Sequence, residues 1–121
     1  MLIVYLTLTG NTRRFVKKLE MDSLEIDSMN PFVQVDQPFV LVAPTYDIEA
    51  TECINDFIEH ENNLEHLKGV IGGGNLNFGD LFVFTAKDLS KEYDSDLLYS
   101  FEYSGTDVDV QNIKDIIEKL D

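Results

Sequence analysis

The chain has 121 residues, of which 44% are hydrophobic and 26% are charged, and this composition is ordinary for a folded protein. A chain of this length has room for one hydrophobic core, so we expect a single domain that spans residues 1–121. The net charge of −14 argues against nucleic acid and anionic membranes as partners, because both require clustered Lys and Arg. The sequence contains neither a long apolar run nor a basic leader segment, so we expect a cytoplasmic protein with no membrane span.

Thiol and metal chemistry have little support in the sequence. Cys53 is the only cysteine, which excludes an internal disulfide, a zinc site of several thiols and a CxxC redox pair. We expect Cys53 to be a small residue packed in a helix rather than a reactive thiol. His60 and His66 are expected at the surface, without partners for a metal site. A redox function would therefore need a bound cofactor.

Apolar patterning predicts alternating strands and helices along the whole chain. In chain order we expect a strand at 2–6, a helix around 15–19, a weaker strand at 23–26, an irregular link at 27–37, a strand at 39–43, a helix around 54–58 that Leu64 extends, a strand at 69–71, a helix at 81–89, a strand at 97–101 and a helix at 113–120. The strand runs are nearly continuous rather than alternating, which is typical of parallel strands covered on both faces. This alternation predicts an open α/β sheet with right-handed crossovers.

Ligands of such sheets bind beyond the carboxyl ends of the strands, where the strand order reverses. The first loop at this edge consists of Thr7, Leu8, Thr9, Gly10, Asn11 and Thr12. It combines a helix N-terminus, three hydroxyl groups and a flexible glycine, so we predict a phosphate site there. The absence of a lysine argues against a Walker A motif, and a threonine cap without ligand is the alternative. Arg13 and Arg14 follow in the first helical turn and are expected to point to solvent.

The pattern T-x-T-G-N-T after an N-terminal apolar strand resembles the FMN-phosphate loop of flavodoxins. The resemblance implies that a second loop, consisting of Pro44, Thr45, Tyr46 and Asp47, passes the edge of the flavin. Tyr46 either contacts the flavin ring or caps the core beside the sheet.

A third loop, expected at 72–80 after the fourth strand, is rich in glycine. Glycine there indicates a sharp bend or a close approach of the backbone. The residues expected to contact the flavin are Gly74, Asn75, Asn77, Phe78 and Gly79. Phe78 either covers the outer face of the flavin or begins the apolar stripe of the next helix.

The pattern G-N-x-N-F-G of this loop, together with F-E-x-x-G-T at 101–106, resembles the NrdI family. These proteins are flavodoxin-like activators of class Ib ribonucleotide reductase. The T-G-N-T loop, V-D-x-P-F at 35–39 and L-x-G-V-I at 67–71 extend the similarity over nearly the whole chain. The resemblance implies an α/β, flavodoxin-like three-layer sandwich with a five-stranded parallel sheet in the order 2-1-3-4-5.

The resemblance also implies a function. Reduced FMN reacts with dioxygen and supplies superoxide or a related oxidant. This oxidant reaches the dimanganese site of the radical-generating small subunit of class Ib ribonucleotide reductase and helps to form a tyrosyl radical. An electron-donating reductase supplies the electrons, and the protein is expected to be a monomer that docks transiently.

Two departures from the family pattern bear on this function. The second loop continues as Tyr46-Asp47-Ile48-Glu49 without a glycine, so we expect a restricted backbone and more negative charge near the flavin. The expected consequence is a lower second-electron potential or weaker FMN binding. Leu76 stands where many relatives have arginine. The alternatives are a general electron-carrier flavodoxin and a divergent, FMN-free interaction protein.

Overall fold

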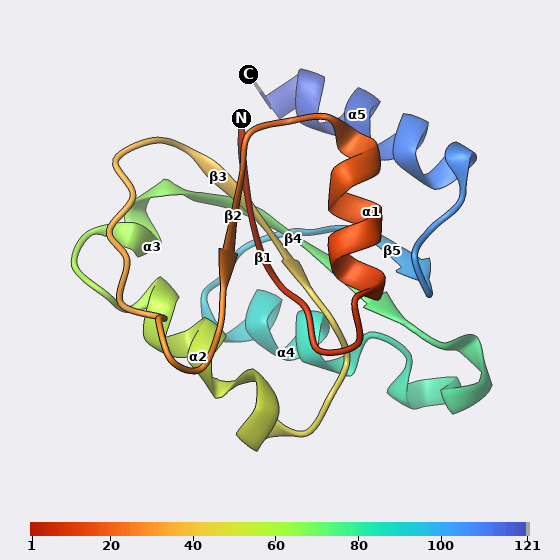
Figure 1. Cartoon of the computed structure of the whole chain (residues 1–121), viewed down its shortest axis with the longest axis horizontal. Coiled ribbons are helices and arrows are strands. Elements are labelled where there is room, and N and C mark those ends of the chain that lie inside the picture. Colours follow the sequence, from red (N-terminus) through yellow and green to blue (C-terminus); the bar gives the residue numbers. More distant parts are fainter. Residues whose placement is uncertain (121) are drawn as a thin grey trace.

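The computed structural model describes residues 1–120, apart from the side chains of Phe78 and Asp80. Five parallel strands form one sheet in the order β2-β1-β3-β4-β5 (Figure 1). The strands are β1 (Leu2–Leu6), β2 (Ser23–Ile26), β3 (Phe39–Ala43), β4 (Leu67–Gly74) and β5 (Leu97–Glu102). This order confirms the predicted topology, and it places the carboxyl ends of all five strands along one edge of the sheet.

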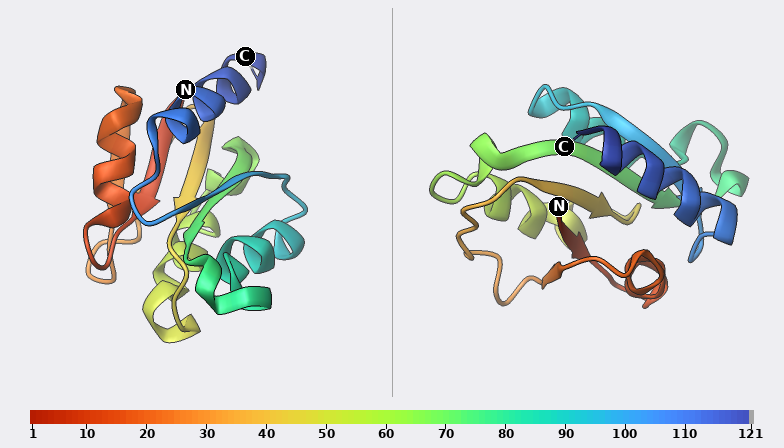
Figure 2. Two further views of the ribbon diagram at one scale, coloured as in Figure 1. Left: turned by 90° about the vertical axis from the view of Figure 1, so that its right-hand side faces the viewer. Right: turned by 90° about the horizontal axis from the view of Figure 1, so that it is seen from above.

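Helices cover both faces of the sheet (Figure 2). The helices α1 (Asn11–Leu19) and α5 (Asp107–Leu120) lie on one face, and α2 (Ile48–Ile58) and α4 (Phe84–Glu92) lie on the other. Strands β1 and β3 are buried along their whole length between the two helix layers. This burial explains why their sequences are continuously apolar instead of alternating.

Strand β4 extends three residues further than the sequence pattern predicted. Gly72, Gly73 and Gly74 were expected in a loop, but they form the end of the strand. A Cβ atom at Gly72 would lie 2.7 Å from the Cβ of Ala86 in α4, and one at Gly73 would lie 2.8 Å from the ring of Phe101. Gly72 therefore allows α4 to pack closely against the sheet, and Gly73 leaves room for the ring of Phe101 on the neighbouring strand β5, so neither glycine marks a bend in the backbone.

The helices after α1 also begin or end at other residues than the apolar pattern predicted. Residues Leu76–Leu81 form a 3-10 segment, η1, which Gly79 interrupts with a φ of +58°. The following helix starts only after Val83, whose φ is +49°. Leu64 does not extend α2, because it belongs to a separate short helix, α3 (Asn63–His66), and is exposed.

The link between β2 and β3 is irregular, as predicted, and one buried side chain holds it in place. Asn63 in α3 is 0% exposed and accepts a hydrogen bond from the backbone N–H of Val35 at 2.8 Å. Its amide group donates to the carbonyl oxygens of Val33 and Phe57, both at 2.8 Å. Asn63 therefore joins the link to the end of α2. The link itself takes the place of the helix that would otherwise connect β2 to β3.

Cys53 is buried in α2, and this burial raises the pKa of its thiol. Both observations fit the expectation of a packed rather than a reactive cysteine. Within residues 1–120 as described, His, Cys, Asp and Glu form no cluster of three or more that is placed to hold a metal ion. No described helix combines the length and apolar character that a bilayer crossing requires.

Candidate functional site

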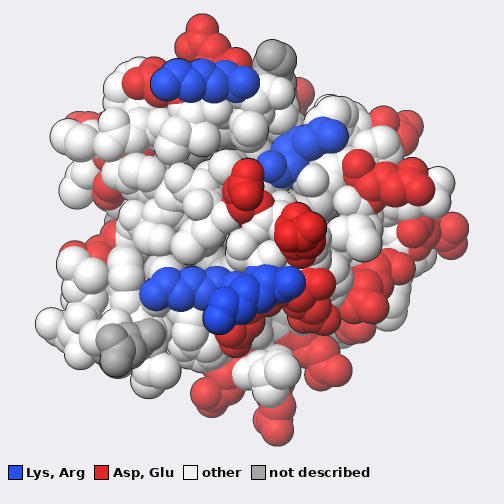
Figure 3. Space-filling model, turned by 180° about the vertical axis from the view of Figure 1, so that it is seen from behind, with Lys and Arg blue, Asp and Glu red and all other residues white. Residues whose placement is uncertain are grey.

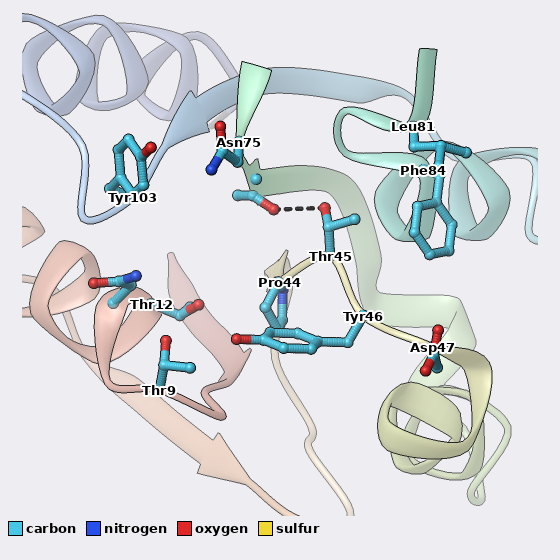
Figure 4. A pocket seen from close by; sticks show the side chains of 13 residues that line it. Thr9, Thr12, Pro44, Thr45, Tyr46, Asp47, Asn75, Leu81, Phe84 and Tyr103 are labelled. Carbon is cyan, nitrogen blue, oxygen red and sulfur yellow. Dashed lines mark hydrogen bonds between the residues drawn. The ribbon is translucent and has the colours of Figure 1, made fainter. Parts of the chain in front are cut away.

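A cavity of about 450 Å³ opens at the carboxyl edge of the sheet (Figure 4). Its wall comes from the start of α1, the loop after β3, the end of β4, and the segments that follow β4 and β5. The cavity lies beside the neighbouring strands β1 and β3. The chain continues from β1 to β2 on one side of this pair, and from β3 to β4 and β5 on the other side. Such a crevice is the usual ligand site of open α/β sheets, and the volume suits a small organic ligand.

The N-terminus of α1 forms the first part of the wall. Gly10 precedes the helix with a φ of +91°, and its N–H donates to the hydroxyl oxygen of Thr7 at 3.0 Å. The N–H groups of Asn11 and Thr12 have no protein hydrogen-bond partner among the described residues. The side chains of Thr9 and Thr12 lie at this end of the cavity (Figure 4). Free N–H groups and hydroxyls at a helix N-terminus form a favourable site for an anion.

The loop after β3 forms the second part of the wall and is held at two points. The hydroxyl of Thr45 donates to the carbonyl oxygen of Gly73 at 2.7 Å (Figure 4). The hydroxyl of Thr85 accepts from the N–H of Tyr46 and donates to its carbonyl oxygen, both at 3.2 Å. This double contact fixes the backbone of Tyr46, whose ring extends across the cavity toward Thr9.

The third part of the wall joins the ends of β4 and β5. The N–H of Tyr103 donates to the carbonyl oxygen of Gly74 at 3.1 Å, and the N–H of Leu76 donates to a carboxylate oxygen of Glu102 at 3.2 Å. Tyr103 has a φ of +53° and is 55% exposed. A positive φ is unusual for a tyrosine, and the hydrogen bond from its N–H to Gly74 holds this backbone beside the cavity.

The structure brings nine of the predicted site residues together in the cavity wall. They are Thr9, Asn11, Thr12, Pro44, Thr45, Tyr46, Asp47, Gly74 and Asn75. Five others lie in the same loops but outside the wall: Thr7, Leu8, Gly10, Asn77 and Gly79. The predicted contact of Phe78 lies outside the described part of the structure, because its side chain is not described.

Four residues of the wall were not predicted: Gly73, Leu81, Phe84 and Tyr103. Tyr103 directly follows β5, so the rule that ligands bind beyond the carboxyl ends of strands could have found it. The predicted site included only the loops that follow the first, third and fourth strands. Phe84 was not predicted to line the site. The start of α4 depends on Val83, whose left-handed backbone conformation has no sequence signal.

The wall combines polar groups with aromatic rings. Hydroxyl and backbone N–H groups gather at the start of α1, the ring of Tyr46 reaches toward them, and the rings of Phe84 and Tyr103 lie elsewhere in the wall. Among the described wall residues, Asp47 carries the only charge, and Glu49 lies outside the wall on the exposed start of α2. This arrangement suits a ligand with a flat aromatic part and a separate anionic group.

Comparisons with known proteins agree with this geometry. The family model described as NrdI Flavodoxin like matches residues 3–115. A protein named Protein NrdI from Bartonella henselae is 34% identical over 125 residues, which cover 99% of this chain and 95% of that protein. Another, from Mycoplasmopsis pulmonis, is 36% identical and covers 96% of this chain and 82% of its own length.

Solved structures show the same fold. The oxidised flavodoxin 2 from Bacillus cereus superposes with a TM-score of 0.66 at 18% identity, over 98% of this chain and 97% of that one. A short-chain flavodoxin associated with a bacterial microcompartment gives a TM-score of 0.61 at 21% identity.

Proposed function

Because the chain belongs to the NrdI family of flavodoxin-like proteins, we propose that residues 1–121 act as one FMN-binding redox domain of the class Ib ribonucleotide reductase system. Its role is to supply a superoxide-type oxidant for assembly of the dimanganese–tyrosyl radical cofactor. The partners are the radical-generating small subunit and an electron-donating reductase, and the protein acts in the cytoplasm as a monomer. The cavity, which combines a helix end with free N–H groups and aromatic rings, is the observation that carries this proposal.

The residues of the cavity fit FMN. The flat ring system of FMN would lie near Tyr46 and Tyr103, and its phosphate would lie at the start of α1. There the free N–H groups of Asn11 and Thr12 can donate to phosphate oxygens. Asn75 can offer its amide to the polar edge of the ring, because the N–H of Asn77 engages only its oxygen.

When bound, reduced FMN would supply the electrons that convert dioxygen into the oxidant, and the protein would supply binding, orientation and electrostatics. The backbone of Tyr46 is held by Thr85, so this part of the loop is in place before a ligand arrives. Asp47 places a negative charge in the wall beside Tyr46, which would disfavour negative charge on a reduced flavin ring.

Radical assembly in the partner subunit tests this function. The reduced protein, loaded with FMN, is mixed with dioxygen and with the manganese-loaded small subunit, and the tyrosyl radical is measured by electron paramagnetic resonance. We expect a radical yield at least about tenfold above that with an equal concentration of reduced free FMN, because the protein confines the oxidant near its target. A yield no higher than with free FMN would overturn the activator role and leave the electron-carrier alternative.

A further inference from the structure

Positive charge is scarce in this protein, and much of it lies on α1. Of the nine Lys and Arg residues in the chain, four belong to this helix: Arg13, Arg14, Lys17 and Lys18. The sequence of α1 contains no Asp or Glu, whereas each of the other described α-helices contains at least one. Many acidic side chains are visible on the opposite face of the molecule (Figure 3). The helix that begins at the cavity is therefore an exception in an acidic protein.

Two of these cations are engaged in contacts that stabilise the fold. The guanidinium of Arg13 donates to both carboxylate oxygens of Glu25 in β2, at 2.8 and 2.9 Å, and lowers the pKa of that carboxyl group. The ammonium of Lys18 donates to the carbonyl oxygens of Ser104 and Gly105 at 3.1 and 3.0 Å. Lys17 and Lys18 also lie in the last turn of α1, at the end away from the cavity.

Arg14 has a different arrangement. Its side chain folds back toward the start of α1, and its Nη2 donates to the side-chain oxygen of Asn11 at 2.6 Å. Its Nη1 lies 3.1 Å from the position that a Cβ atom at Gly10 would occupy. Asn11 belongs to the cavity wall, so the guanidinium of Arg14 lies beside the expected phosphate end. Among the described residues, Arg14 makes no ion pair with a carboxylate.

We infer that Arg14 is a positioning residue that makes the cavity selective for a phosphorylated flavin, because it orients Asn11 and places an unneutralised positive charge at the phosphate end. This inference rests on the proposed FMN function. A phosphate ester carries a charge of about −1.5 to −2 at pH 7, which a protein of net charge −14 repels. Arg13 carries the same charge one residue earlier, but Glu25 neutralises it. Arg13 is therefore a matched control.

The test compares dissociation constants for FMN and for riboflavin, which lacks the phosphate, in the full-length protein. Quenching of flavin fluorescence gives both values at low and high salt. We expect Arg14→Gln to weaken FMN binding about tenfold and to change riboflavin binding less than about twofold. Arg13→Gln should change FMN binding less than about threefold, because it removes a cation that is already paired. Arg14→Lys, which restores the charge but not the planar group, should give an intermediate FMN affinity.

The outcomes separate this inference from the proposed function. Equal losses of FMN affinity in Arg14→Gln and Arg13→Gln would overturn the inference, since net charge alone would explain them. Parallel losses of FMN and riboflavin in Arg14→Gln would also overturn it, because they would indicate a disturbed loop. If the unchanged protein binds riboflavin as tightly as FMN, the cavity is not selective for the phosphate. That result would overturn the inference and leave the proposed flavin binding in place. If it binds neither flavin, the proposed function itself fails.

Discussion

Replacing Asn63 by alanine should lower the free energy of unfolding by about 3–4 kcal/mol, as measured by urea denaturation. The three hydrogen bonds of Asn63, each 2.8 Å long, join a side chain that is 0% exposed to backbone groups of the link and of α2. Alanine would leave the N–H of Val35 and the carbonyl oxygens of Val33 and Phe57 without this partner. An unsatisfied buried polar group costs about 1–3 kcal/mol, and a small cavity adds to the loss.

The neighbouring Asn62 offers a matched control for this prediction. Asn62 precedes α3, is exposed, and makes no side-chain capping hydrogen bond. Asn62→Ala should therefore change the free energy of unfolding by less than about 0.5 kcal/mol. Similar losses in the two variants would contradict the structural role assigned to Asn63.

The double substitution Thr9→Val and Thr12→Val should weaken FMN binding about a hundredfold without changing riboflavin binding. Both hydroxyls lie at the α1 end of the cavity, where the phosphate is proposed to bind. A hydrogen bond to a charged group contributes about 1.5–3 kcal/mol, and two bonds to one phosphate are not fully additive. Valine keeps the shape of threonine, so the loop should stay folded. Fluorescence titration with the two flavins provides the measurement.

Thr51→Val is the matched control for the double substitution. Thr51 is a buried threonine of α2 outside the cavity, and its hydroxyl makes one long hydrogen bond, 3.3 Å, to the carbonyl oxygen of Asp47. We expect its FMN affinity to stay within about threefold of the unchanged protein. Equal weakening of FMN and riboflavin in the double variant would contradict a phosphate site at Thr9 and Thr12.

The sheet was predictable because burial on both faces leaves a direct mark on the sequence. Strands β1 and β3 are continuously apolar for this reason, and their bounds match the predicted ranges. The glycines at the end of β4 were misassigned because glycine marks both bends and close packing. Only the positions of Ala86 and Phe101, which are distant in sequence, show that packing is the cause here.

The candidate site was predictable where its parts are local in sequence. The loop before α1 carries its hydroxyls, its glycine and the helix start within six residues, so its chemistry is visible without the fold. The contacts of Tyr46 with Thr85, and of Tyr103 with Gly74, join segments far apart in sequence. The same holds for Asn63, whose role depends on three backbone groups in two other segments. Such contacts leave no periodic pattern from which they could be predicted.

Retention of FMN by the purified protein tests the central claim most directly. The protein is mixed with excess FMN, passed over a gel-filtration column, and examined by visible absorbance and flavin fluorescence. We predict that about one FMN per chain elutes with the protein, with its fluorescence quenched by the aromatic rings of the cavity. A colourless protein, with all FMN eluting as free flavin, would contradict the claim that this cavity is an FMN site.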